Sequence, residues 1–277
     1  DGRALFWNTA GYAATNWNIL GATCRNETGV VAGVNCVSGG ASGRQNRLRT
    51  FNDAIIARST NKGGSQQGTL SLTKPFSRES DWSWMASYTY TNAEEVSPLT
   101  SSTSGSNLGN VAVFQANEEV SARSSYAIQD RFTAAFNWKH NFWGDNQTLF
   151  TVYYEGRSGK PYSYTFDNDA NGDGGGFNDL FYVPAGPGDV KFGTLSSSGV
   201  FVANAAMETS FFNWLASVPE LNAFRGSYAP ANGFRTDWVN TFDLRLSQEL
   251  PGLFAGHKSK VWVDIQNIGN MLNEDWG

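Results

Sequence analysis

The chain has 277 residues, of which 40% are hydrophobic, 14% aromatic and only 16% charged. The formal net charge is −5, so the composition gives no indication of a surface that binds nucleic acid. No apolar run approaches the roughly 18 residues that a transmembrane helix needs, which excludes helical membrane spans. Few charges, many aromatic residues and 30 glycines are typical of a β-barrel with aromatic girdles and polar loops.

Seven stretches alternate apolar and polar residues with the period of two that a strand imposes on its side chains. They predict strands at 49–60, 67–76, 82–96, 126–142, 146–158, 236–250 and 259–268. In Trp238–Leu250 the apolar Phe242, Leu244, Leu246 and Leu250 share one side, and Asp243, Arg245, Ser247 and Glu249 share the other. Each stretch is about as long as the 9–11 residues that cross a membrane as a tilted barrel strand.

The connections between these stretches alternate between short and long. Short ones are expected at Ser77–Asp81, Trp143–Asn146 and Pro251–Ser259, and long ones at 97–125 and 159–235. Outer-membrane barrels combine short periplasmic turns with long external loops. Aromatic residues crowd the short-turn ends, as an interface girdle would: Phe76, Trp82, Trp84, Phe142, Trp143 and Phe254. The pattern therefore predicts an all-β, antiparallel transmembrane barrel segment, with 159–235 as a long extracellular loop.

Within that loop, 204–218 is predicted to be a short helix. Phe211, Trp214, Leu215 and Val218 fall at the spacing of one helix face, and Pro219 ends the pattern. Residues 97–110 are rich in Ser, Thr, Gly and Asn and are expected to be a mobile loop tip.

The two cysteines, Cys24 and Cys36, lie close together in a stretch rich in Gly, Asn and Val. This spacing suggests a disulfide formed in an oxidising compartment such as a periplasm or a cell surface. Two buried free thiols are the alternative.

The segment that begins at Asp167 resembles the start of a calcium-binding loop. Oxygen ligands recur at alternate positions, and Gly172 permits a sharp bend. The ligand set would be Asp167, Asp169, Asn171, Asp173 and Asp179. Because Asn178 stands where the motif requires a bidentate Glu, an Asx- and Gly-rich turn without a metal is the alternative. A bound Ca²⁺ would be structural and would stiffen the external loop.

The charged residues of the alternating stretches are expected to face the lumen of the barrel. They are Arg131, Lys139, Glu155, Asp243, Arg245, Glu249 and Asp264. They are expected either to pair with one another and with a plug, or in part to line a transit path. Near the loop base, Tyr153, Tyr162, Tyr164, Phe166 and Tyr182 are expected either to form an upper girdle or to stack on an oligosaccharide or peptide.

Catalysis is not expected from this sequence. His140 and His257 are the only histidines, and both fall near predicted short turns, away from the long loops. A Ser/His/Asp site would need a base and a nucleophile held together. We therefore expect no catalytic residues.

Several segments carry a family resemblance. They are GRSGKPYSYTFDNDANGDGGGFNDLFYVP at Gly156–Pro184, FRGSYAPANGFRTDWVNTFDLRLSQELP at Phe224–Pro251, VWVDIQNIGNMLNEDWG at Val261–Gly277, and IARSTNKGGSQQGTLSLTKPF ending at Phe76. Together they resemble the barrel of the Oar-like group of TonB-dependent receptors. The resemblance implies a 22-stranded barrel of a Gram-negative outer membrane, occluded by an N-terminal plug, that takes up a scarce ligand with energy from the TonB–ExbB–ExbD complex. We then expect residues 1–277 to be a C-terminal portion of that barrel, without the plug and the final strands.

Three functions follow as hypotheses. The first is a TonB-dependent receptor that contacts outer-membrane lipid, contacts the TonB complex through a plug, and carries an unknown peptide, oligosaccharide or chelate, with no role for nucleic acid. The second is a surface adhesion or structural protein on the same barrel, with calcium-stiffened loops. The third is a soluble β-sandwich that binds carbohydrate, in which the apolar faces would form a sealed core.

Overall fold

The structure is a computed structural model that describes residues 7–8, 11–12, 23–26, 29–35, 55–115, 117–167, 170, 176–195 and 201–273. The chain divides into two compact units. The first unit, called the loop unit here, comprises Asp1–Lys62, Val96–Ala122 and Ser163–Phe234. The second, called the sheet unit, comprises Gly63–Glu95, Arg123–Tyr162 and Arg235–Gly277.

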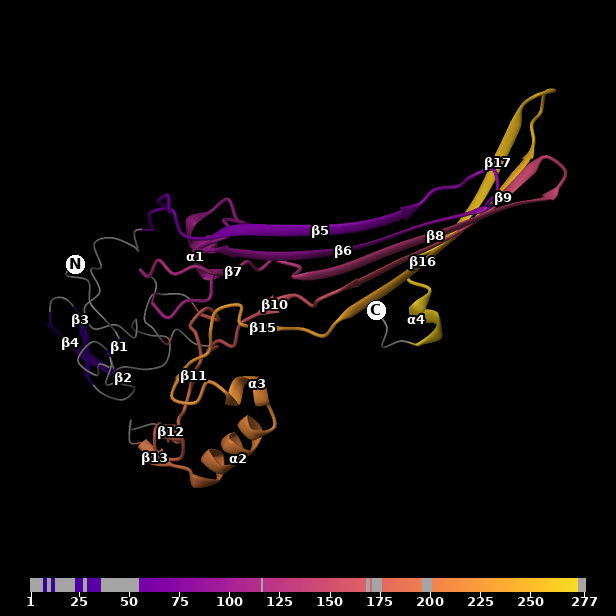
Figure 1. Ribbon diagram of the computed structural model, residues 1–277. Coiled ribbons are helices and arrows are strands. Elements are labelled where there is room, and N and C mark those ends of the chain that lie inside the picture. Colours follow the sequence, from indigo (N-terminus) through magenta and orange to yellow (C-terminus); the bar gives the residue numbers. More distant parts are fainter. Residues whose placement is uncertain are drawn as a thin grey trace. The chain divides into compact units, whose positions relative to one another are not determined.

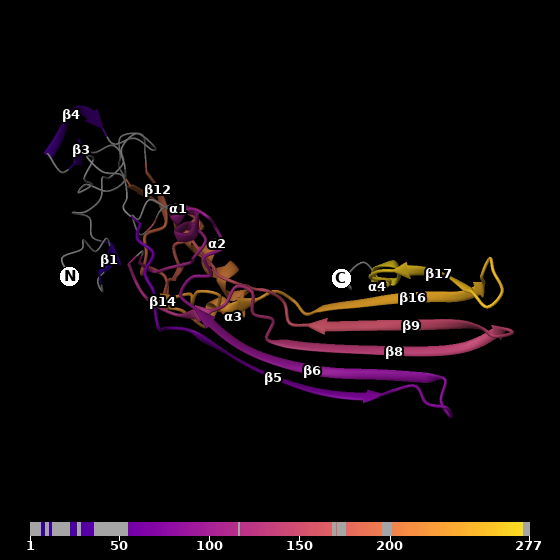
Figure 2. The ribbon, with the colours of Figure 1, turned by 90° about the horizontal axis from the view of Figure 1, so that it is seen from above.

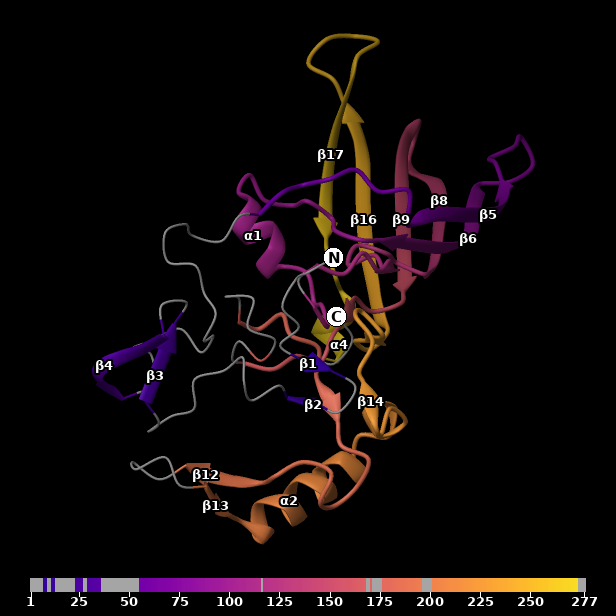
Figure 3. The ribbon, with the colours of Figure 1, turned by 90° about the vertical axis from the view of Figure 1, so that its left-hand side faces the viewer.

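The sheet unit is built on an antiparallel sheet in the order β17-β16-β9-β8-β6-β5, and the short β7 pairs with β6 (Figure 1). Its strands are β5 (Gly64–Lys74), β6 (Trp82–Glu95), β7 (Ala122–Arg123), β8 (Asp130–Trp143), β9 (Asn146–Arg157), β16 (Val239–Pro251) and β17 (Lys258–Ile265). β16 and β17 run at an angle to β5 and β6 in Figure 3, as the twist of a β-sheet requires. The fold is therefore predominantly antiparallel β, as the alternation predicts.

Six of the seven predicted strands are present, with ends shifted by a few residues. The prediction at 49–60 is wrong for residues 55–60, which form no strand, and residues 49–54 lie outside the described part of the chain. Ile55 and Ile56 are adjacent rather than alternating, so a strand would point them to opposite sides, and both are exposed.

The register keeps like side chains together across the strands. One row joins Leu244, Val152, Phe136 and Trp84, and a second joins Leu246, Phe150, Trp138 and Trp82. Between them lies the row Arg245, Thr151, Asn137 and Ser83. Since a slip of one residue would exchange the two sides of a strand, this register makes one apolar face and one polar face.

The apolar face is not sealed against a second sheet. Within the described residues of the sheet unit, its side chains remain between 42% and 69% exposed at Leu70, Leu72, Phe132, Phe136, Leu246 and Val263. Phe242 is half-buried. A soluble sandwich would have enclosed Phe136, Phe242 and Leu246, so this arrangement lacks the core that the sandwich hypothesis requires.

The three short connections lie at the same end of the sheet (Figure 2). They join β5 to β6, β8 to β9, and β16 to β17, as predicted. Gly144 has a φ of +58° as the first central residue of the two-residue β8–β9 turn, which matches a type II′ hairpin. Exposed aromatic side chains cluster around these turns: Phe76, Trp82, Phe142, Trp143 and Phe254.

The loop unit consists of short elements. Its strands are β1 (Trp7–Asn8), β2 (Gly11–Tyr12), β3 (Thr23–Asn26), β4 (Gly29–Asn35), β11 (Tyr182–Val183), β12 (Gly193–Leu195), β13 (Phe201–Ala203) and β14 (Ser227–Tyr228). Its helices are α1 (Ser104–Gly109), α2 (Ala205–Ala216) and α3 (Pro219–Asn222). β10 (Pro161–Tyr162) and β15 (Phe234–Arg235) lie where the chain passes between the units, and α4 (Gly269–Leu272) follows β17. None of the helices in the described ranges is long and apolar enough to cross a membrane.

Helix α2 organises the loop unit. The side chain of Asn204 accepts hydrogen bonds from the amides of Ala206 and Met207, which caps the helix at its first turn. Leu215 is fully buried, and Phe211 contacts Phe181 and Phe192 with ring centroids 6.3 and 5.0 Å apart. The β12–β13 hairpin lies beside α2 (Figures 1 and 3). The predicted loop helix is therefore confirmed.

The expectation of a single helix is wrong. α1 occupies the predicted loop tip at 97–110, α3 begins where Pro219 ends the pattern of α2, and α4 follows β17. These helices have four to six residues, too few for the repeating apolar pattern from which α2 is recognised.

Replacing Leu215 by alanine should destabilise the loop unit by about 2–5 kcal/mol, because the residue is fully buried and its removal leaves a cavity. Leu99→Ala is the matched control in the same unit: Leu99 is 63% exposed, and its loss should cost within about 0.5 kcal/mol. Hydrogen exchange of the α2 amides under mild denaturant measures the loss of stability for both substitutions. Equal effects of the two substitutions would contradict a core at Leu215.

Candidate functional site

The polar face of the sheet carries the predicted lumen-facing charges. By register, six of the seven predicted residues lie on it: Arg131, Glu155, Asp243, Arg245, Glu249 and Asp264. The seventh, Lys139, shares the face, and its ammonium lies 4.7 Å from the ring centroid of Phe76. The structure thus brings these groups onto one surface, opposite the aromatic rows.

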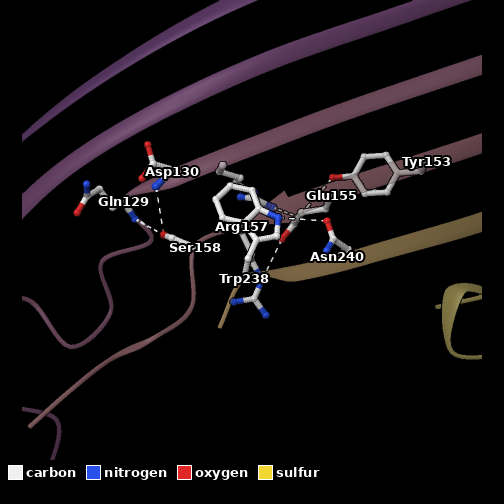
Figure 4. Close-up of polar contacts among 9 residues, drawn as sticks. Gln129, Asp130, Tyr153, Glu155, Arg157, Ser158, Trp238 and Asn240 are labelled. Carbon is white, nitrogen blue, oxygen red and sulfur yellow. Dashed lines mark hydrogen bonds and ion pairs between the residues drawn. The ribbon is translucent and has the colours of Figure 1, made fainter. Parts of the chain in front are cut away.

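Glu155 is the centre of a charged cluster at one end of β9 (Figure 4). Its carboxylate pairs with the guanidinium of Arg131 across the strands, and Oε1 lies 3.2 Å from Nε of Arg157. The hydroxyl of Tyr153 donates a long hydrogen bond of 3.5 Å to the same group. These contacts place the carboxylate between two guanidinium groups.

A second set of ion pairs joins β16 and β17. Arg245 binds Asp264 through two parallel bonds, Nε to Oδ1 at 2.5 Å and Nη2 to Oδ2 at 2.7 Å. Lys258 Nζ lies 2.7 Å from Oε2 of Glu249. The backbone amide of Asn267 donates to Oδ1 of Asp243 at 2.8 Å. Among the predicted charges, Arg131 pairs with Glu155 and Arg245 with Asp264, whereas the partner of Glu249 is Lys258, which was not among them.

Uncharged groups connect the remaining strands on this face. Thr151 Oγ1 donates to Oδ1 of Asn137 at 2.8 Å, and Nδ2 of Asn137 donates to Ser83 Oγ at 3.2 Å. Ser87 and Thr133 share a hydrogen bond of 2.6 Å. Cross-strand bonds of this kind fix the register as well as the polarity of the face.

The polar face is hollowed where β8, β9, β16 and β17 meet. The hollow has a volume of about 630 Å³ and is lined by residues that include Tyr153, Arg245, Lys260 and Trp262. Trp262 and Lys260 were not among the predicted site residues. The sequence does contain a signal for them, because the alternation that puts Val261 and Val263 on the apolar side puts Lys260, Trp262 and Asp264 on the other.

The ends of the long connections are held where β8 begins and β9 ends (Figure 4). Ser158 Oγ accepts from the amides of Gln129 and Asp130 at 3.0 and 3.2 Å. The guanidinium of Arg235 donates to the carbonyls of Ala127 and Gly159, each at 3.2 Å, and to Oε1 of Gln129 at 3.0 Å. A Cβ on Gly159 would lie 2.1 Å from the carbonyl oxygen of Thr236, so only glycine permits this close approach.

The predicted calcium ligands are only partly described. Asp167 is exposed, and Asp179 is buried with Oδ2 accepting from the amide of Ala170 at 2.6 Å. Asp169, Asn171 and Asp173 lie outside the described residues. No group of three or more His, Cys, Asp or Glu side chains that could hold a metal occurs in the part of the chain that the structure describes. Calcium binding stays a prediction.

The aromatic residues predicted near the loop base separate between the units. Tyr153 lies on the polar face of the sheet, and Tyr162 ends β10. In the loop unit, Tyr164 packs on Phe234, Phe166 on Phe181 and Tyr182 on Tyr228, with centroids 4.8, 4.9 and 5.3 Å apart. Tyr164, Phe166 and Tyr182 therefore pack on other rings of the loop unit. The structure tests neither the girdle hypothesis nor the stacking hypothesis.

Tyr182 also takes part in a polar turn of the loop unit. The amide of Ala185 and the hydroxyl of Tyr182 both donate to Oδ2 of Asp189 at 2.8 Å. These two bonds hold the pKa of the Asp189 carboxyl below its usual value. The same carboxylate raises the pKa of the Tyr182 hydroxyl.

Neither histidine, nor Cys24 among the described residues, is part of the lining of the hollow. Cys24 lies in β3, whose register places Thr23 opposite Asn35, but Cys36 lies outside the described residues, so the disulfide stays a prediction. His140 lies near the end of β8 that leads into the β8–β9 turn, and His257 lies in the β16–β17 turn, as expected.

Comparisons with protein-family models, with curated proteins and with solved structures find no match to this chain. The resemblance to TonB-dependent receptors therefore stays a prediction.

Reversing one charge of the Arg245–Asp264 pair should lower the unfolding midpoint, because two like charges would then face each other across β16 and β17. The single variants are Arg245→Asp and Asp264→Arg, and the double variant that exchanges the two residues should recover most of the loss. Thermal unfolding in detergent measures all three. If the unfolding midpoint of the double variant falls by as much as the falls of the two single variants added together, the pair does not couple the strands.

Proposed function

We propose that the sheet unit is part of the wall of an outer-membrane β-barrel of a Gram-negative bacterium. Its apolar face would contact lipid, and its polar face would line the lumen. The observation that carries this proposal is the row of large apolar side chains that stays exposed along one side of the long strands.

Strand length supports the proposal. β6 and β8 have 14 residues each, and at about 3.3 Å per residue such a strand is about 46 Å long. A strand of that length, tilted by about 45°, covers about 33 Å along the membrane normal, enough for the hydrocarbon layer. The aromatic residues around the short turns would then lie at the periplasmic interface.

The energetics of the apolar face support the same location. Removing a Leu, Val or Phe side chain fully from water gains about 1.5–3 kcal/mol. A face that leaves many such side chains in water is therefore costly, and such a surface normally marks a membrane or a protein interface. Hydrocarbon would cover Leu70, Phe132 and Val263 without a second protein layer.

The edges of the sheet support a larger wall. In the described sheet, β5 and β17 are hydrogen-bonded to a neighbour on one side only. Unpaired backbone groups cost several kcal/mol each in lipid, so barrels close. Further strands would have to complete the wall, and the family resemblance implies 22 in all.

Within such a barrel, we propose the role of a TonB-dependent receptor that takes up a scarce ligand. The lumen side would pass the ligand inward, and a plug from the same protein would couple it to the TonB complex. The pairing of Arg131, Glu155, Arg245 and Asp264 with one another supports a lumen wall that is stable in itself. No bond chemistry is assigned to this site.

A surface adhesion or structural protein is the second candidate. It is favoured by the loop unit, which has its own buried core at Val183, Leu215 and Leu221 and so offers a defined surface for a partner. The complete gene distinguishes the two. An N-terminal plug with a TonB box favours the receptor, and a coding sequence without either favours the adhesin.

A spin label on the apolar face should contact lipid. In a background with Cys24→Ser and Cys36→Ser, Leu72→Cys labels the apolar face of β5 and Thr73→Cys the polar face of the same strand. After reconstitution in lipid vesicles, the label at residue 72 should be relaxed more by oxygen, which dissolves in hydrocarbon. The label at residue 73 should be relaxed more by a water-soluble nickel chelate. Equal nickel access at both positions would refute lipid contact.

An arginine on the apolar face should impair folding into a bilayer. Ala134 and Ala135 are adjacent on β8 and point to the apolar and the polar face, respectively. Ala134→Arg should cost about 2–4 kcal/mol if the residue lies near the bilayer midplane, whereas Ala135→Arg should be nearly neutral. Equilibrium refolding into vesicles gives both values, and a larger loss for Ala135→Arg would reverse the assignment of the faces.

A further inference from the structure

The hollow on the polar face has the size of a ligand site. Its volume of about 630 Å³ falls within the roughly 300–1,000 Å³ typical of sites for small molecules. All of its lining residues belong to β8, β9 and β16 and to the segment from β17 to Gln266. A paired sheet therefore supplies a rigid floor.

Trp262 is the unexpected residue in this hollow. It lies on β17 opposite Ser247, and its side chain is 60% exposed on the face that carries the charges. Lipid cannot cover it there if the other face contacts hydrocarbon. Because an exposed indole in a polar surface is costly in water, a ligand with an apolar side of its own would stabilise it.

The charged side chains that line the hollow with Trp262 have no net charge. Asp243 and Asp264 balance Arg245 and Lys260, two acidic against two basic groups. Arg245 and Asp264 are paired with each other, Asp243 accepts the amide of Asn267, and Lys260 lies opposite Glu249 in the β16–β17 register. An ionic ligand would have to compete with these neighbours, so the hollow favours a polar ligand without net charge.

We propose that this hollow binds a neutral oligosaccharide, with one sugar ring stacked on Trp262. The C–H groups on the flat side of a pyranose are apolar and weakly positive, which suits the negative face of the indole. Asn137, Thr151 and Gln266 line the same hollow with amide and hydroxyl groups, which suit sugar hydroxyls because both partners donate and accept. The proposal rests on the barrel function, for which it names the ligand class.

A peptide suits the hollow less well. Peptides bind sheets mainly by adding a strand to an edge, whereas the hollow lies on the face of strands that are already paired. A neutral peptide is therefore the comparison ligand of the test.

The chain in detergent would be titrated calorimetrically with four neutral hexasaccharides (maltohexaose, cellohexaose, xylohexaose and laminarihexaose), with hexagalacturonate, and with a neutral Gly-Ser hexapeptide. At least one neutral sugar should bind more tightly than the acidic sugar and the peptide. Trp262→Ala should weaken that sugar about tenfold, in line with the loss of a stacking contact and its buried area. Trp262→Phe should keep most of the affinity, since it keeps a ring.

Val261→Ala is the matched control, because Val261 precedes Trp262 on β17 and points to the apolar face. Its sugar affinity should be unchanged. The proposal is overturned if no neutral sugar binds, if the acidic sugar or the peptide binds best, or if Trp262→Ala and Val261→Ala behave alike. The spin label at residue 72 reports lipid contact without any sugar, so a failure of the barrel function is seen separately from a failure of this site.

Discussion

The registered alternation of side chains across six long strands is the constraint on which the rest of the structure depends. Each strand alone separates apolar from polar residues, but only the pairing of rows such as Leu246, Phe150, Trp138 and Trp82 turns that separation into two continuous faces. A slip of one residue in any pair would place a charge among aromatic rings. The ion pairs and hydroxyl bonds of the polar face oppose such a slip. The strand register thus creates the two faces, and the contacts on the polar face stabilise the register.

The sequence predicts the parts of the fold that depend on local pattern. The six long strands, the order of short and long connections and helix α2 follow from periods of two and of 3.6 residues. The segment 55–60 fails because it lacks alternation. Short helices such as α4 are not predicted, since four residues carry no period.

The candidate site was predicted only in part. That Arg245 and Asp264 share a face follows from alternation, but that they are partners depends on the β16–β17 register, which the pattern of one strand cannot supply. The hollow combines two hairpins that are far apart in the chain, β8–β9 and β16–β17, and was not predicted. Trp262 could have been recognised, because its neighbours on the alternating pattern are charged. In the loop unit, the bridge between Val113 and Asp179 is likewise non-local.

The contacts of Arg235 and Gly159 have a consequence for how this protein can vary. One guanidinium and one close backbone approach tie down both ends of the connection between β9 and β16, directly where it leaves the sheet. Changes in the segment between those ends therefore do not alter the register of the strands. Lengthening a closed loop also costs little free energy. Evolution can therefore change the segment between β9 and β16 by insertion or deletion while the pairing of the strands stays the same.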